Sequence, residues 1–382
     1  MHRVYFDNSA TTPVLPEVFE AMRPYFSEHF GNASSIHHHG QETRAAVERA
    51  RDSVASLLGC RAPEVVFTSG GTEADNLAIR GIVKEGQHVV TTAIEHPAVL
   101  NTSAALDATF VPVGRDGVVD PEDIRKALRK NTVLISVMHG NNEIGTVQPL
   151  CEISIVAREA GVLLHSDGVQ AVGRIPVNVN ELGVDLYSMS GHKLGAPKGI
   201  GALYVRDKTP LSAISFGGHH ERERRPGTEN VAGAVALGVA AGLMTDTRAL
   251  RDQLEQGILA RVPRTFVNGA NAQRLPNTTN ICFEGIEGEA LLIALKNVAV
   301  SSGSACTSAS LEPSYVLKAL GVGDELAHSS IRFGLGRFNT EEEVDFVIDD
   351  VVRAVNHLRD MSPLYEMHKQ GIDLKTVPWA AH

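Results

Sequence analysis

The sequence predicts an α/β protein with a large, mostly parallel seven-stranded sheet between helices and a smaller α+β domain. Three observations support this fold class. Short apolar runs alternate with stretches of helical periodicity up to about residue 250, which is typical of a parallel sheet. Beyond that point the strands become shorter and the alternation is lost. The length of 382 residues is sufficient for two domains.

Seven apolar runs are the expected strands of the large sheet. They are 65–67, 88–92, 110–113, 133–138, 162–165, 186–188 and 202–205. Helical periodicity separates several of them, as in 121–129 and 152–160. The uncharged run 231–244 is too short to span a bilayer, so we expect a buried helix there.

The C-terminal third is expected to form the smaller domain. A helix begins at Arg248, and a charged amphipathic helix spans 341–359. Between them lie short strands at 279–283, 298–301 and 330–333.

Composition narrows the classes of function. The net charge of -10 and the lack of a long basic run argue against direct binding of nucleic acid. The N-terminus lacks the apolar core of a signal peptide, and no apolar stretch is long enough for a membrane span. The four cysteines show neither a CxxC pair nor metal-ligand spacing, which favours reduced thiols in the cytoplasm. The run His37–His39 lacks companion ligands, so we expect a polar loop.

Lys193 and Asp167 lie where predicted strands give way to polar residues. In parallel strands both would emerge at the carboxyl edge of the sheet, where open α/β sheets bind ligands. Pyridoxal phosphate (PLP) needs an amine to attach to and an acid that keeps its pyridine nitrogen protonated. The pair therefore suggests a PLP site. Taken singly, a surface lysine and a helix-capping aspartate are the simpler interpretation.

A glycine-rich segment, 68–75, follows a predicted strand and opens a helix. Backbone N–H groups at such a helix start bind phosphate, and Gly71 and Thr72 are the natural contacts. Ser190 and His192 flank the lysine and can add donors to the same phosphate. Alone, the segment is also an ordinary helix cap.

Three further polar residues follow predicted strands. His96 could stack on the cofactor ring and move protons, because the pKa of histidine lies near neutrality. Asn142 and Gln170 could contact the ring oxygen of the cofactor. Each is also consistent with an ordinary loop residue.

Cys306 lies in the polar segment 301–308, whereas Cys282 lies in an apolar run. A thiol in a polar, exposed segment is available for reaction, so Cys306 is the candidate nucleophile. The alternative is an incidental surface cysteine.

Together these segments resemble the NifS/IscS-type cysteine desulfurases, a group of class V aminotransferases among the fold-type I PLP enzymes. The resemblance covers essentially the whole chain. Its matching segments are 6–13, 68–76, 95–96, 141–145, 190–193, 225–230 and 301–308. The Cys306 segment has the long form of group I enzymes, and the tail 362–371 resembles the scaffold-docking region of the IscS branch.

The resemblance implies an enzyme that takes sulfur from L-cysteine, gives L-alanine and leaves a persulfide on Cys306. The implied catalytic residues are Lys193, Cys306 and His96, and Arg332 with Asn142 would bind the substrate. Asp167 would pair with the pyridinium. The implied cofactor-binding set is Gly71, Thr72, His96, Asn142, Asp167, Gln170, Ser190, His192, Lys193 and, from the second subunit of a homodimer, Thr228.

The resemblance also implies partners and domain limits. An IscU-type iron–sulfur scaffold and other sulfur acceptors, including those of tRNA thiolation, would receive the sulfur, with Cys306 as a transient iron–sulfur ligand. The large PLP-binding domain would span 13–250, and 1–12 with 251–382 would form the small domain carrying the cysteine segment. Gly71 and Gly168 depart from the alanine usual at their positions.

Two alternatives stay open from the sequence. Another PLP reaction, such as selenocysteine lysis or amino transfer, would keep Lys193 and Asp167 but have less need of Cys306. A sulfur carrier or scaffold without enzymatic activity would need Cys306 but not an intact cofactor pocket.

Overall fold

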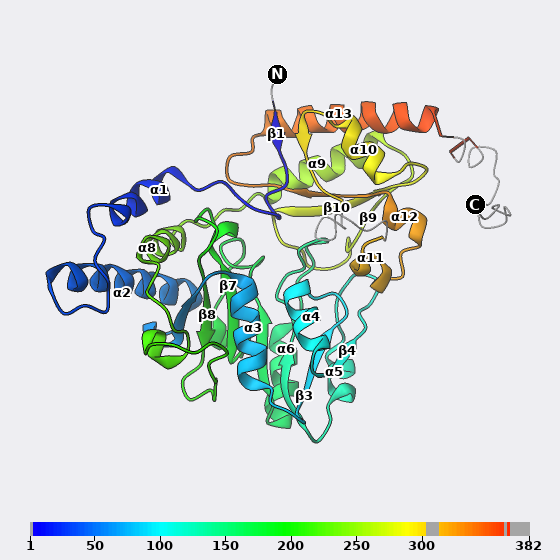
Figure 1. The fold of residues 1–382 in the computed structure, drawn as a ribbon. Coiled ribbons are helices and arrows are strands. Elements are labelled where there is room, and N and C mark those ends of the chain that lie inside the picture. Colours follow the sequence, from blue (N-terminus) through cyan, green and yellow to red (C-terminus); the bar gives the residue numbers. More distant parts are fainter. Residues whose placement is uncertain (1–2, 303–312, 363–364, 367–382) are drawn as a thin grey trace.

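The computed structural model describes residues 3–302, 313–362 and 365–366. Its central feature is a seven-stranded sheet in the order β2-β8-β7-β6-β5-β3-β4 (Figure 1). The strands are β2 (Val65–Thr68), β3 (His88–Thr92), β4 (Asp107–Val111), β5 (Thr132–Ser136), β6 (Leu163–Asp167), β7 (Leu186–Ser190) and β8 (Gly201–Val205). The predicted α/β fold class is confirmed.

The central sheet is mostly parallel. Strands β4, β3, β5, β6 and β7 pair in parallel, and β8 runs antiparallel to both of its neighbours, β7 and β2. All seven predicted strands are present. The strand expected at 110–113 starts earlier, at Asp107. Most of β4 is exposed or half-buried at the edge of the sheet, so no apolar run marks its start.

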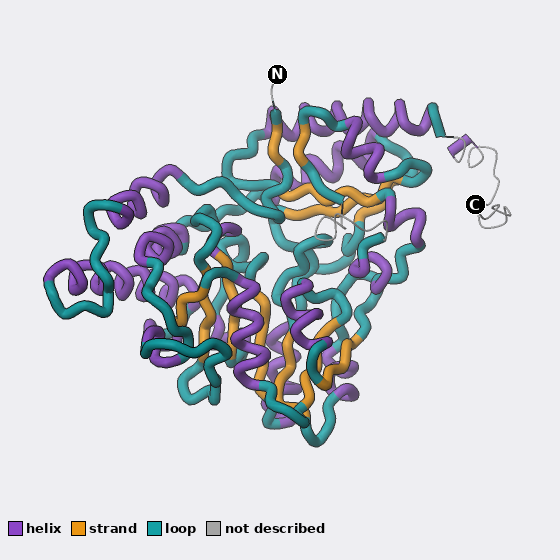
Figure 2. Tube along the Cα trace, viewed as in Figure 1, coloured by secondary structure: helices purple, strands orange, loops and turns teal. Residues whose placement is uncertain are grey.

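Helices cover both faces of this sheet (Figure 2). The helices of this part of the fold are α1 (Pro16–Met22), α2 (His38–Leu58), α3 (Gly71–Ile82), α4 (Pro97–Ala104), α5 (Pro121–Ala127), α6 (Leu150–Ala160), α7 (Val179–Leu182) and α8 (Val231–Ala240), with short 3-10 turns at Arg23–Phe26 and Ala62–Glu64. Alternate residues of a strand belong to different apolar cores. Val65 and Phe67 pack with α2 and α8, whereas Val66 packs with α3.

The second part of the fold has its own apolar core. Strands β9 (Thr265–Val267), β10 (Thr278–Phe283) and β12 (Ser330–Gly334) form an antiparallel sheet, and β1 (Val4–Tyr5) pairs with β11 (Val298–Ala299). Helices α9 (Arg248–Arg261), α10 (Gly288–Ala294), α11 (Tyr315–Ala319), α12 (Asp324–His328) and α13 (Glu341–Asp360) complete it. Val4 and Phe6 share this core with Leu254 and Ile281. The domain limits at residues 13 and 250 stay predictions.

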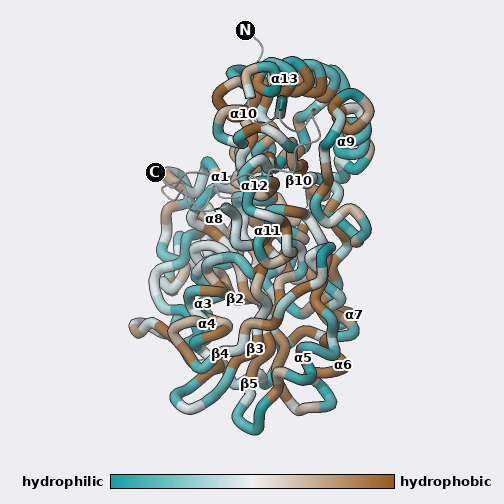
Figure 3. Tube along the Cα trace, turned by 90° about the vertical axis from the view of Figure 1, so that its right-hand side faces the viewer, coloured by the Kyte–Doolittle hydropathy of each residue, from teal (hydrophilic) through white to brown (hydrophobic). Residues whose placement is uncertain are grey.

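Helix α13 shows why the amphipathic pattern at 341–359 predicted a helix. Its buried residues recur at helical spacing, including Val344, Val347, Ile348 and Val351, so one stripe faces the core (Figure 3). Three glutamates occupy its first turn, where the helix dipole favours negative charge.

Two expectations about helices need correction. The run His37–His39 is not a loop, because His37 caps α2 and the helix starts at His38. The helix expected at 231–244 ends at Ala240. No helix in the described ranges is both long and apolar enough to cross a membrane.

A buried ion pair fixes the loop between β8 and α8. Arg51 of α2 donates to both carboxylate oxygens of Glu221, at 2.7 and 2.8 Å, and Glu221 also accepts from the N–H of Phe67 at 2.9 Å. Glu221, Arg222 and Glu223 have φ angles of 46°, 57° and 63°. Left-handed backbone costs about 1–2 kcal/mol for each non-glycine residue, so the loop needs this anchor.

We therefore expect Glu221→Gln to lower the free energy of unfolding by about 3 kcal/mol, because it leaves the buried Arg51 charge without its partner. Urea unfolding followed by far-ultraviolet circular dichroism measures the loss. Glu48→Gln is the matched control. Glu48 also contacts Arg51, at 3.2 Å, but is 51% exposed, so its loss should cost less than about 1 kcal/mol. Equal losses in both variants would contradict the anchoring role of Glu221.

Candidate active site

A cavity of about 280 Å³ opens at the carboxyl ends of β6 and β7 and the start of α3. It brings together every site residue predicted from the sequence except Thr228 and Cys306. The predicted residues that line it are Gly71, Thr72, His96, Asn142, Asp167, Gln170, Ser190, His192, Lys193 and Arg332. Cys306 lies outside the described residues, and Thr228 does not line this cavity.

Lys193 lies on a 3-10 turn, Gly191–Lys193, that directly follows β7. Its Nζ donates to the backbone carbonyl of Ser9 at 2.5 Å and to that of Ala10 at 2.7 Å. The N-terminal segment thus forms one wall of the cavity. Sequence reasoning matched 6–13 to a family segment but gave Ser9 and Ala10 no role, because carbonyl contacts leave no side-chain signal.

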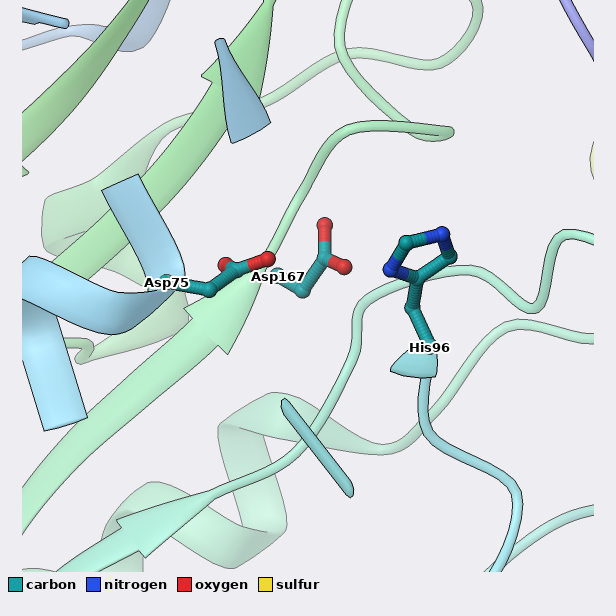
Figure 4. A group of neighbouring side chains, drawn as sticks. All are labelled: Asp75, His96 and Asp167. Carbon is teal, nitrogen blue, oxygen red and sulfur yellow. The ribbon is translucent and has the colours of Figure 1, made fainter. Parts of the chain in front are cut away.

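Asp167 lies at the end of β6 between Asp75 of α3 and His96 at the start of α4 (Figure 4). Potential ligand atoms of these three side chains all lie within 4.8 Å of one another. Burial and the neighbouring Asp167 raise the pKa of Asp75 well above its usual value. Burial also raises the pKa of Asp167, while His96 and Lys193 act in the opposite direction.

Asp75 is the acidic group of this cluster that sequence reasoning missed. It lies in the glycine-rich segment 68–75, where an aspartate on a helix usually faces solvent. Here it is 1% exposed, and its Oδ1 has no hydrogen-bond partner among the described residues. Only the packing of α3 against β7 and β8 reveals its burial.

His96 caps α4, and its Nδ1 accepts from the N–H of Ala98 at 3.1 Å. Burial lowers the pKa of His96, with Lys193 acting in the same direction and Asp167 opposing it. The capping contact leaves Nε2 as the second ring nitrogen for a ligand or a proton.

The part of the cavity at the start of α3 is suited to an anion. Gly70 has a φ of 153°, which favours glycine, and α3 starts at the next residue with its N–H groups unpaired within the helix. Glu73 accepts from the N–H of Ser69 at 2.6 Å and from Arg225 at 2.8 Å, which fixes the turn. Burial, with Lys193 adding to it, lowers the pKa of His192 to about 4, so this imidazole offers a hydrogen bond rather than a charge at pH 7.

Arg332 lies on β12 and is 3% exposed. It donates to Asp7 Oδ1 and to the backbone carbonyl of Asn142, both at 2.9 Å. Its Nε and the side-chain oxygen of Asn142 are buried without a hydrogen-bond partner among the described residues. Unpaired buried polar atoms that line a cavity are expected where a polar ligand binds.

Gln170 is held by its surroundings. It donates to the Ser9 carbonyl at 2.9 Å, and its Oε1 accepts from Arg174 at 2.6 Å. One amide hydrogen remains for a ligand.

The groups of the cavity fit the parts of PLP. The N–H groups at the start of α3 fit its phosphate, Asp167 fits its pyridine nitrogen, and the amine of Lys193 fits its aldehyde.

Two other cysteines are poorly suited to nucleophilic attack. Burial raises the pKa of Cys60 to about 12 and that of Cys282 to about 11, so their thiolates are scarce at neutral pH. Cys151 is exposed on α6, but it does not line the cavity.

Comparison with known proteins finds a matching family and similar full-length relatives. The family described as Aminotransferase class-V matches residues 4–347. A cysteine desulfurase IscS from Anaeromyxobacter sp. (strain Fw109-5) is 52% identical over 397 aligned residues, which cover 99% of this chain and 98% of the relative.

Solved structures show the same likeness. A NifS-like protein superposes with a TM-score of 0.86 at 34% identity, covering 93% of this chain and 100% of its own. A structure described as SspA in complex with cysteine gives a TM-score of 0.82, also at 34% identity, covering 88% and 100%.

One buried carboxyl beside the cavity makes stability depend on pH. Glu95 is fully buried, and its Oε1 accepts from Thr92 at 2.6 Å and from the N–H of Met138 at 2.9 Å. Burial raises its pKa from 4.5 to about 8. Between these values the folded protein keeps a proton that the unfolded chain releases, so rising pH destabilises the fold.

We expect Glu95→Gln to remove this dependence. The melting temperature of the variant minus that of the wild type should increase as the pH rises from about 5 to about 8. The wild type loses stability over this range, whereas glutamine does not titrate. Differential scanning calorimetry across that range checks it, with the exposed Glu85→Gln as control. A difference that stays constant with pH would show that Glu95 is already ionised in the fold.

Proposed function

This chain belongs to the aminotransferase class-V family and to its IscS-type cysteine desulfurases, and we propose that its cavity binds PLP and L-cysteine. The proposed reaction yields L-alanine and a persulfide on Cys306. The observation that carries the proposal is the meeting of Lys193, Asp167 and Arg332 in one cavity. The first two suit the amine and the acid that PLP requires, and Arg332 suits the carboxylate of an amino acid.

Bound PLP would supply the electron sink that stabilises negative charge at Cα of the substrate. Lys193 is the proposed point of attachment for PLP and the base that moves the Cα proton. Asp167 would keep the pyridine nitrogen of bound PLP protonated. Burial disfavours its charged form, whereas His96 and Lys193 favour that form. His96 is proposed to stack on the ring.

The remaining contacts divide between the two ends of the cofactor. Gly71, Thr72, Ser190 and His192 are proposed to bind the phosphate, supported by the position of the α3 start in the cavity. Thr228 of a second subunit would complete this set. Asn142 and Gln170 are proposed to contact the ring oxygen.

Arg332 is the proposed anchor for the substrate carboxylate, with Asn142 nearby. Asp7 holds one terminal nitrogen of the guanidinium at 2.9 Å, which limits its rotation, while Nε has no partner among the described residues. A planar guanidinium fixed in this way suits the carboxylate group of L-cysteine.

The sulfur step is assigned to Cys306. Its thiolate attacks the sulfur of L-cysteine, so an S–S bond forms and the Cβ–S bond breaks. The electron pair of the broken bond stays on the carbon side, which takes a proton and leaves as alanine. The raised pKa values of Cys60 and Cys282 support this choice of nucleophile.

The proposed biological setting follows the IscS branch. We propose a cytoplasmic homodimer that passes persulfide sulfur to an IscU-type scaffold and to other acceptors, including those of tRNA thiolation. Cys306 would then act as a transient iron–sulfur ligand with the scaffold. A sulfur carrier without enzymatic activity would not need the buried donors and acceptors of the cavity, which argues against that alternative.

Loss of Cys306 should separate desulfuration from other PLP reactions. With PLP, L-cysteine and a reductant, we expect the wild type to release sulfide and alanine in equal amounts. Cys306→Ala should retain PLP but lose turnover by at least about 100-fold, because the sulfur acceptor is gone.

Cys151→Ala is the control, because it removes the exposed thiol that lies away from the cavity. It should keep full turnover. Continued formation of alanine by Cys306→Ala would contradict the persulfide route and favour a lyase reaction.

A further inference from the structure

Gly168, the residue that follows Asp167, has no room for a side chain. A Cβ atom there would lie 2.0 Å from Cζ, 2.1 Å from Cε1 and 2.3 Å from the hydroxyl oxygen of Tyr187. Carbon atoms in contact lie about 3.5–4.0 Å apart, so alanine at this position would displace the tyrosine ring. Glycine at 168 and tyrosine at 187 are therefore a matched pair.

The tyrosine side chain crosses the end of β6. Tyr187 belongs to β7 and is paired with Ser166 of β6, yet its hydroxyl lies 2.7 Å from Nδ1 of His139, which follows β5. The strand order is β7-β6-β5, so the ring spans from one neighbour of β6 to the other. It passes through the space left empty by Gly168.

We call the hydrogen bond between the Tyr187 hydroxyl and His139 Nδ1 the bridge, and both of its side chains are buried and uncharged. Tyr187 is 0% and His139 4% exposed. Burial, with Asp167 adding to it, raises the pKa of Tyr187 well above its usual value, and burial lowers that of His139 to about 4. The imidazole is therefore neutral at pH 7. The Tyr187 hydroxyl and Nδ1 of His139 therefore share one hydrogen bond in either tautomer of the neutral ring.

Both ends of the bridge hold the backbone around Asp167. The N–H of His139 donates to the carbonyl of Asp167 at 2.8 Å, and the N–H of Gly168 donates to the carbonyl of Ser188, next to Tyr187, at 3.0 Å. The N–H of Val169 then donates to Asp167 Oδ1 at 2.9 Å. A shift of this turn would move the carboxylate.

We propose that Tyr187 and His139 are positioning residues that hold the Asp167 carboxylate in register with the cofactor ring. This inference rests on the proposed function, because it assigns Asp167 to the pyridine nitrogen. The competing explanation is that Tyr187 only fills space in the core. The hydroxyl separates the two explanations, because phenylalanine fills nearly the same volume without the bridge.

Tyr204 provides a matched control. It lies on β8, is paired directly with Tyr187 and is equally buried. Its hydroxyl has no hydrogen-bond partner among the described residues. Tyr204→Phe therefore removes a buried hydroxyl from the same layer without breaking a bridge.

The test measures the dissociation constant of PLP from protein stripped of cofactor and then titrated with PLP. We expect Tyr187→Phe to weaken PLP binding about fivefold or more, the equivalent of one lost hydrogen bond, and to shift the pH midpoint of the visible band of bound PLP. Tyr204→Phe should match the wild type in both. If Tyr187→Phe lowers the melting temperature but leaves both cofactor measurements unchanged, Tyr187 only fills space and the proposal fails.

A second pair of variants tests the match with Gly168. Gly168→Ala should weaken PLP binding about tenfold or more, whereas the same change in a Tyr187→Leu background should cost less than about threefold, because the collision has been removed. If Gly168→Ala weakens PLP binding equally in both backgrounds, the claim that Gly168 makes room for the Tyr187 ring is wrong. Failure of the wild type itself to bind PLP would instead contradict the proposed function.

Discussion

The site depends on the parallel pairing of β6 with β7. Because these strands run in the same direction side by side, with Asp167 opposite Ser188, the residues that follow them emerge at one edge of the sheet. Strand β8 runs antiparallel to both β7 and β2, so β2 is parallel to β7 and also ends at that edge. The glycine-rich turn after β2 thus reaches the same cavity as Lys193.

Burial of acidic groups sets the charge of the cavity. Asp75, Glu95 and Asp167 lie close together in a region with little water, where three negative charges would repel strongly. Burial raises the pKa of each carboxyl. His96 and Lys193 oppose this rise at Asp167, whereas hydrogen bonds from Ser188 and from Thr92 oppose it at Asp75 and Glu95. The two cationic or basic neighbours thus distinguish Asp167, the acid proposed to pair with the pyridine nitrogen, from Asp75 and Glu95.

The sequence predicted the strands and most of the residues that line the cavity. Polar residues that directly follow apolar runs can be recognised from the order of residues alone, without knowledge of the fold. Lys193, Asp167 and His96 all have this signature. Asp75 was missed because its burial depends on the packing of a helix on the sheet. The hydrogen bond between Tyr187 and His139 was missed because it joins β7 to the segment that follows β5, and these two strands are not neighbours in the sheet.

Backbone contacts and strained loops could not be predicted from the sequence either. The carbonyls of Ser9 and Ala10 bind Lys193 across a long stretch of sequence, and nothing in their residue types indicates it. Left-handed backbone at Glu221 is unexpected for a non-glycine residue. The fold explains it, because the buried ion pair with Arg51 holds Glu221 in place. The unusual Gly168 was noticed in the sequence, but its cause, the ring of Tyr187, appears only in the fold.

Lys193, at the edge formed by β6 and β7, is the proposed carrier of the cofactor. Borohydride reduction of the PLP-loaded protein, followed by proteolysis and mass spectrometry, tests it directly. The reduced cofactor should be found on the peptide that contains Lys193, and Lys193→Ala should lose the label. Labelling of another lysine, such as Lys198, at full occupancy in the wild type would contradict the assignment of the site.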